Sequence, residues 1–298
     1  MQSFSRGWSF LKQAWEMAFK DKDLLKPSIN ALVVGLIVSV LGIIPIVIAY
    51  FIFGGSAIGN LVLFTMGSIL VFVQFVVTYV FSGMTVYLIY GYLTEGDGHM
   101  DKAWEIVRRD FFDILTLAAA SALVSMLKSS SRRNGRDSLL SGLVRSAAGV
   151  LETLWTEAAL LVLPAMIIDD LNLKDGLRRI WEITKENVLL IGISTVGVRL
   201  VTGLISFIFS AIGFVVAVGI GGGSAYLSGG ITAVSIVGTV IGALIFFSFV
   251  MVASIFSSYT NTAYHTCLYI WARDVETAQA EGSSVQVKAP APLAAALA

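Results

Sequence analysis

The sequence predicts an all-α polytopic membrane protein with about six transmembrane helices. They form three helical hairpins, and an amphipathic interfacial helix precedes each hairpin. The chain is 56% hydrophobic and only 13% charged, whereas soluble domains carry about 25% charged residues. A Trp-Glu pair also recurs three times before a long apolar stretch. Uncharged runs longer than the ~18–20 residues that cross a bilayer occupy positions 28–53, 57–94 and 200–272.

The Trp-Glu pair indicates an internal repeat. Each copy has an Asp or Asn six residues after its tryptophan: Trp15 and Asp21, Trp104 and Asp110, Trp181 and Asn187. Residues 1–276 are therefore predicted to form a single transmembrane domain. Its three repeats cover about 1–95, 96–170 and 171–276. Residues 277–298 are rich in Ala, Pro and Ser and have no apolar periodicity, which predicts a disordered tail.

Each repeat is predicted to begin with an amphipathic helix. In the first repeat, one face at helical spacing carries five apolar residues: Phe4, Trp8, Leu11, Trp15 and Phe19. Two interpretations remain open. The helices lie in the headgroup layer with Trp15, Trp104 and Trp181 as interfacial anchors. Alternatively, they pack on their own bundle, which requires the same apolar stripe.

A helical hairpin is predicted after each amphipathic helix. The predicted helices are 28–53 with 59–93, 107–127 with 148–168, and 188–218 with 231–271. The third helix leaves an alternative, because its apolar part, 114–127, has only 14 residues and a re-entrant segment would leave five spans. The repeat favours six spans, since similar Trp-Glu helices are expected to face the same side of the membrane.

The distribution of basic residues predicts the orientation in a cell (inner or plasma) membrane. With six spans and a cytoplasmic N-terminus, the C-terminus is cytoplasmic too. The cytoplasmic segments then carry 14 Lys and Arg residues and the opposite side carries 5. The five-span alternative gives 13 and 6. The positive-inside rule favours a cytoplasmic N-terminus in both cases.

Two ionisable residues lie deep within predicted spans. Arg199 is about eleven residues into the fifth helix, and Glu157 is about nine residues into the fourth from the other side. Their similar depth predicts that Glu157 and Arg199 form a buried ion pair. Ionisable groups inside a membrane are costly and are functional candidates by default. The pair is therefore interpreted either as part of an ion or proton path or as a contact that fixes helix packing.

Polar side chains form a stripe on the second predicted helix and another on the sixth. These residues are Gln74, Thr78, Ser82 and Thr85, and Ser257, Thr260, Asn261 and His265. The stripes are expected either to line a polar cavity between the two helices or to join helices by hydrogen bonds of ~0.6 kcal/mol each. His265 has no Cys, Asp or second His at ligand spacing, so neither a metal nor a cofactor is expected.

Several motifs are similar to those of a known family. They are Ser9-Phe10-Leu11-Lys12 before Trp15, Lys20-Asp21-Lys22-Asp23-Leu24-Leu25, Trp155-Thr156 through Pro164-Ala165-Met166, the segment 176–187, and Ala263-Tyr264 with Leu268-Tyr269 and Trp271-Ala272. Together they resemble an uncharacterised family of prokaryotic six-helix integral membrane proteins, a domain of unknown function, over most of residues 5–273. The resemblance implies a fold and a membrane location, but it implies no substrate, reaction or catalytic residues. The basic segment 129–133 departs from the pattern.

The sequence predicts no enzyme, because no catalytic set converges by spacing. The favoured hypothesis is a membrane scaffold or complex subunit whose partners are the lipid bilayer and other membrane proteins or a second copy of the chain. The alternative is a small-solute or ion transporter or channel that uses the polar cavity between the second and sixth helices. The net charge of zero gives no argument for nucleic acid.

Overall fold

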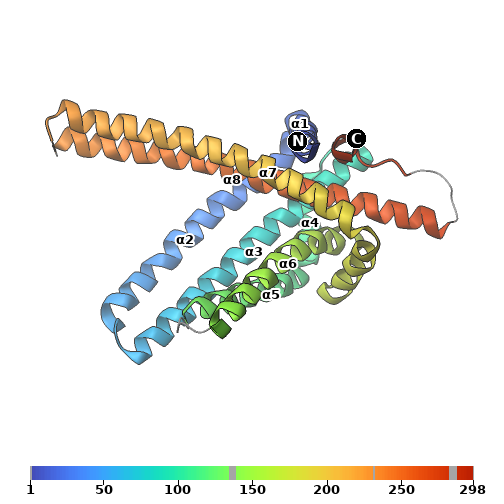
Figure 1. Cartoon of the computed structure of the whole chain (residues 1–298), viewed down its shortest axis with the longest axis horizontal. Helices are drawn as coiled ribbons and strands as arrows, with labels where there is room; N and C mark the ends of the chain where they lie inside the picture. The colour runs from blue at the N-terminus through green and yellow to red at the C-terminus, as the bar shows by residue number, and fades with distance from the viewer. Residues whose placement is uncertain (1, 134–138, 231, 282–286, 298) are drawn as a thin grey trace. The chain divides into compact units, whose positions relative to one another are not determined.

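The computed structural model describes residues 2–133, 139–230, 232–281 and 287–297, and its regular structure there is entirely helical (Figure 1). The elements are α1 (Gln2–Lys20), the 3-10 helix η1 (Lys22–Leu25), α2 (Lys26–Phe53), α3 (Ala57–Glu95), α4 (Met100–Arg109), α5 (Phe111–Arg133), α6 (Leu139–Asp169), α7 (Leu173–Leu227), α8 (Ala233–Ala280) and α9 (Ala291–Leu297). The predicted all-α fold is therefore confirmed.

Among the residues that the structure describes, six helical stretches are long and apolar enough to cross a membrane. They are Lys22–Phe53, Ala57–Glu95, Phe111–Ser129, Gly149–Asp169, Val198–Leu227 and Ala233–Ala280. The third stretch has 19 residues, because α5 extends past both ends of the predicted apolar segment. It is therefore long enough to span, and the six stretches of the described part make the protein a polytopic membrane protein.

The chain forms two compact units. The first, which we call the α2–α6 unit, consists of Asp21–Val188 and His265–Pro290. The second, the α7–α8 unit, consists of Met1–Lys20, Leu189–Tyr264 and Ala291–Ala298. The first two predicted hairpins lie in the α2–α6 unit, and most of the third lies in the α7–α8 unit.

In the α2–α6 unit, α3 packs against α2, α5 and α6 (Figure 1). The core lies along the second half of α3, where Met84, Leu88 and Ile89 are buried. At Gly83 a β-carbon would lie 3.2 Å from the Ile167 side chain of α6, so the absent side chain permits close helix packing. In contrast, the most apolar windows of the spans that contain α2 and α3 have no buried residue. Such large exposed apolar surfaces are expected to face lipid.

In the α7–α8 unit, α7 and α8 form an antiparallel hairpin (Figure 1). Its helices approach closely at small residues: a β-carbon at Gly213 would lie 2.6 Å from Phe249 Cβ, and one at Gly242 would lie 2.6 Å from the Ala217 carbonyl oxygen. α9 packs on α1. Leu293 of α9 is fully buried and anchors this short helix.

Two predicted boundaries differ from the structure. The third amphipathic segment is the first part of α7, which continues to Leu227, and is not a helix of its own. Part of the predicted disordered tail is helical, since α8 extends to Ala280 and α9 covers Ala291–Leu297. Alanine has the highest helix propensity. Burial of Leu293 adds tertiary packing that the sequence pattern of the tail does not indicate. Residues 282–286 of the tail lie outside the described part.

Candidate functional site

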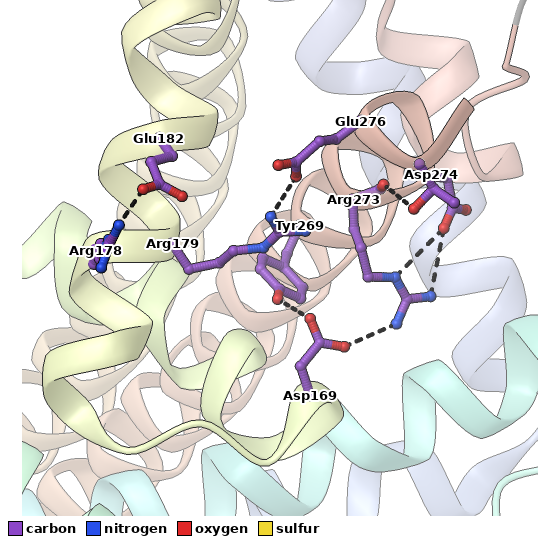
Figure 2. Close-up of polar contacts among 9 residues, drawn as sticks. Asp169, Arg178, Arg179, Glu182, Tyr269, Arg273, Asp274 and Glu276 are labelled. Atoms are coloured by element: carbon purple, nitrogen blue, oxygen red, sulfur yellow. Dashed lines mark hydrogen bonds and ion pairs between the residues drawn. The ribbon is translucent and has the colours of Figure 1, made fainter. Parts of the chain in front are cut away.

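A set of charged and aromatic side chains joins the end of α6, the start of α7 and the end of α8 (Figure 2). Asp169, the last residue of α6, accepts hydrogen bonds from the Tyr269 hydroxyl and from Arg273 Nη1, the latter at 3.1 Å. Arg179 Nη1 of α7 lies 2.5 Å from Glu276 Oε2 of α8. We call these five residues, Asp169, Arg179, Tyr269, Arg273 and Glu276, the helix-end cluster.

Local geometry explains why these side chains meet. Tyr269 and Arg273 are four residues apart on α8, and Glu276 follows three residues later, so all three share one helix face. Asp170 adopts a left-handed conformation with φ 54°, which ends α6. Asn172 Oδ1 then accepts the Asp175 amide at 3.0 Å and caps the start of α7. The short connection therefore holds the end of α6 beside the start of α7.

The helix-end cluster also reaches α3. The Arg273 guanidinium carbon lies 5.6 Å from the centre of the Tyr90 ring, within the range of a cation–π interaction. Tyr269 is only 1% exposed, while Asp169 and Arg273 are partly buried. Burial alone would lower the pKa of Arg179, but the hydrogen bond and negative charge of Glu276 outweigh it and raise that pKa above its ordinary value. Side chains of four helices, α3, α6, α7 and α8, thus meet in this cluster.

A second polar contact joins the end of α4, directly before α5, to the end of α6. Arg109 Nε lies 2.6 Å from Asp110 Oδ1, and Arg109 Nη2 lies 3.1 Å from Asp170 Oδ1. Asp110 is buried. Burial raises the pKa of its carboxyl above the ordinary value, because the opposing effect of Arg109 is smaller and Asp170 adds to the rise.

A third polar contact joins the start of α2 to the end of α3. Asp21 Oδ1 accepts the Asp23 amide at 2.9 Å and caps η1, while Oδ2 accepts the Gly98 amide at 2.8 Å. A β-carbon at Gly98 would lie 2.8 Å from the same carboxylate oxygen, so a larger residue would displace Asp21.

These contacts place the hairpin entrances at one end of the α2–α6 unit. Arg273 binds the end of α6 and stacks on the end of α3, and Arg109 binds Asp170 next to it. The starts of α2, α5 and α7 therefore lie at the same end as the ends of α3, α6 and α8. Asp21 and Asp110 are the residues six positions after Trp15 and Trp104. The Trp-Glu pairs and their later acids thus lie at two of these entrances. The Asn187 side chain lies outside the described part.

Within the membrane-spanning part of the α2–α6 unit, Glu157 Oε2 lies 3.3 Å from His265 Nε2. The His265 side chain is 2% exposed, and that of Glu157 is partly buried. His265 was predicted as part of a polar stripe and not as a partner of Glu157. Arg199, the predicted partner, belongs to the α7–α8 unit, and the Glu157–Arg199 pair stays a prediction.

The polar stripes take part in helix–helix and intrahelical hydrogen bonds. Gln74 Nε2 donates to the Gly35 carbonyl at 2.9 Å and to Ser39 Oγ at 2.7 Å, which joins α3 to α2. The hydroxyls of Thr78 and Thr85 donate to carbonyls one turn earlier in α3.

In the α7–α8 unit, Thr260 Oγ1 accepts Trp15 Nε1 at 3.1 Å and donates to the Phe256 carbonyl. Asn261 Nδ2 lies 3.5 Å from Ser257 Oγ. In the α2–α6 unit, the remaining residue of the α3 stripe, Ser82, is partly exposed. Since the two stripes belong to different units, the predicted cavity between them stays a prediction.

The three signature tryptophans have different surroundings. Trp15 stacks on Phe256 with ring centres 4.7 Å apart. Trp104 is 42% exposed, with the Arg108 guanidinium carbon 5.1 Å from its ring centre. Trp181 is 72% exposed. On α1 the exposed aromatic side chains are Phe4, Trp8 and Phe19.

Sequence reasoning missed the helix-end cluster and a buried polar contact at Ser121. Ser121 Oγ lies 2.8 Å from the Tyr79 hydroxyl and accepts Trp155 Nε1 at 2.8 Å, which joins α3, α5 and α6. One signal was available for the cluster: acidic residues end the fourth span, and Arg273 is the first charged residue after the long uncharged run of α8. Opposite charges at span ends on the same side of a membrane are natural partners.

No protein-family model matches this chain, and no curated protein matches it either. The family resemblance of its motifs therefore stays a prediction. Among the described residues, no group of three or more His, Cys, Asp or Glu side chains could hold a metal ion.

Proposed function

We propose that this chain is a non-enzymatic scaffold or complex subunit of the cell membrane, with both termini in the cytoplasm. The observation that supports this proposal is how the polar side chains are used. The helix-end cluster, the Arg109 contacts, the Asp21 cap and the Ser121 contact all join one helix of the chain to another. Such contacts fix the helix ends and so hold a defined surface at one face of the membrane.

The first turns of α7 supply the proposed partner surface. Trp181 is exposed, and the Arg178 side chain beside it is 79% exposed and bonds Glu182 at 3.1 Å (Figure 2). The neighbouring Arg179 is held by Glu276, so this part of α7 is fixed in place. Trp and Arg are enriched among the residues that dominate protein–protein binding energy. We infer that another membrane protein docks over Trp181.

Purification of the full chain from its native membrane in mild detergent tests this function. The wild type should be recovered with one partner at a fixed stoichiometry, and Trp181→Ala should lose that partner. Trp8→Ala is the matched control, because Trp8 is an exposed tryptophan on α1, and this variant should keep the partner. Recovery of the wild type alone as a monomer would contradict the proposal.

A transporter or channel is the second candidate function, favoured by the contact between Glu157 and His265. Two titratable groups 3.3 Å apart within membrane-spanning helices can accept and release a proton. Proton flux into proteoliposomes, with Glu157→Gln as the comparison, tests it. Flux equal to that of empty liposomes across protons, other ions and small metabolites would exclude this function.

A further inference from the structure

Two hollows lie along the first half of α3 in the α2–α6 unit. One, of about 270 Å³, lies between α3 and α5 and is lined by residues that include Gly67, Val71, Ser125 and Met126. The other, of about 770 Å³, lies between α2 and α3 and is lined by residues that include Tyr50 and Asn60. Leu63 and Phe64 line both hollows, which therefore adjoin each other. We call the two together the α3 groove.

The lining of the α3 groove suits hydrocarbon better than a polar solute. Of the described residues that line the two hollows, none is charged. The hydroxyls of Ser68 and Ser129 donate to carbonyls of their own helices, at 2.7 and 2.9 Å. These hydroxyl protons are already used, so the groove wall offers few donors to a polar ligand, and apolar contact dominates any binding there.

The length and ends of the groove match one chain of a lipid. Its lining on α3 runs from Asn60 to Val71, which is about 16 Å at 1.5 Å per residue. That length is about half of the ~30 Å hydrocarbon core, or one leaflet. The polar groups of Tyr50 and Asn60 lie at the end next to the turn between α2 and α3. The groove thus has a polar end followed by an apolar channel, just as a phospholipid has a glycerol ester followed by an acyl chain.

The space in the groove is kept open by a missing side chain. A β-carbon at Gly67 would meet nothing within 4 Å. The surrounding surface of α2 and α3 is apolar and exposed, with Ile43, Phe51 and Leu61 among its side chains, so the groove opens into lipid. We propose that the α3 groove binds one acyl chain of a membrane phospholipid, with the ester region beside Tyr50 and Asn60. This inference does not depend on the proposed scaffold function.

A pair of glycine substitutions tests the proposal. Gly67→Leu fills the groove, whereas Gly203→Leu on α7 is the matched control, because its β-carbon also meets nothing within 4 Å and it lines neither hollow. Both changes replace a helical glycine with a better helix former, so neither is expected to unfold the chain. Ser125→Leu narrows the groove from α5 and serves as an independent second variant.

The measurement is native mass spectrometry of the full chain after transfer from nanodiscs of palmitoyl-oleoyl phosphatidylglycerol into mild detergent. Wild type and Gly203→Leu should keep one phospholipid of the corresponding mass, and Gly67→Leu and Ser125→Leu should lose it. The proposal is overturned if the wild type carries no phospholipid or if the groove variants keep it as the wild type does. It is also overturned if the groove variants instead abolish a dimer, because the occupant would then be a second copy of the chain.

Discussion

Trp15 and Trp181 hold the same position in the predicted repeat, but their helices are fixed in opposite ways. The Trp15 ring stacks on Phe256 and contacts Tyr259, and the Tyr259 hydroxyl donates to the Ala14 carbonyl at 3.0 Å. Aromatic packing therefore holds α1 on α8. The start of α7 is held by the ion pair of Arg179 with Glu276, and its Trp181 stays exposed.

The difference shows that the Trp-Glu pair specifies where a hairpin begins and not what its tryptophan contacts. What the first two entrances share is the acid six residues later, since Asp21 and Asp110 each contact the end of a neighbouring span through Gly98 or through Arg109. Of the two predicted roles of the tryptophans, bundle packing is seen for Trp15, and interfacial anchoring stays a prediction. Trp15 packs on its own unit, and Trp181 is free to contact lipid or a partner.

The largest effect is expected from Trp15→Ala. Loss of the stacked ring and of the hydrogen bond to Thr260 should lower the free energy of unfolding by about 3 kcal/mol. Trp181→Ala should change it by no more than about 0.5 kcal/mol, because an exposed side chain leaves no cavity. Thermal unfolding in detergent micelles measures both variants. Equal losses would show that the two tryptophans are packed alike and would remove the distinction between the two entrances.

The next largest effect is expected from Asp169→Ala. This change removes the acceptor of the buried Tyr269 hydroxyl and of Arg273 Nη1, and it should lower the free energy of unfolding by about 2 kcal/mol. Asp274→Ala is the control: Asp274 also lies near Arg273, at 3.4 Å, but its side chain is more exposed, and about 0.5 kcal/mol is expected. The same unfolding measurement checks both, and equal losses would contradict a special role of the helix-end cluster.

A smaller loss of unfolding free energy is expected from threonine substitutions, and it should depend on whether the hydroxyl bonds to another helix or to its own. Thr260→Val removes the acceptor of Trp15 Nε1 and should cost about 1 kcal/mol. Thr78→Val removes only a hydrogen bond to the Gln74 carbonyl of the same helix. The free energy of unfolding should therefore stay almost unchanged. The double variant Trp15→Phe with Thr260→Val sharpens the test, because Thr260→Val should then cost less than it does alone. Full additivity would show that the hydrogen bond contributes nothing to the packing of α1.

Much of the fold could be predicted from the sequence because it depends on local composition. Run length and charge define the spans, and the Trp-Glu signature marks the hairpin entrances. The contact of Asp169 with Tyr269 could not be predicted, because the two residues are a hundred positions apart. It depends on the rotation of α8 against α6, and apolar periodicity does not report rotation when a helix is apolar on every side. The α9 helix could not be predicted for a related reason. Its packing on α1 stabilises it, whereas its short sequence has no apolar periodicity that would indicate a helix.

The smallest effect is a pH dependence at the second entrance. Burial raises the pKa of Asp110 above its ordinary value, so the folded chain holds this proton at a pH at which the unfolded chain has released it. Stability from this group is therefore full below the ordinary aspartate pKa and falls as the pH rises from that value to the raised one. Above the raised value the loss is complete and constant. Unfolding of wild type and Asp110→Asn in steps from pH 3 to pH 7 measures it, and the wild type should lose stability relative to the variant across that window. A relative gain would mean that Arg109 outweighs burial and that the second entrance is held by charge attraction, like the third.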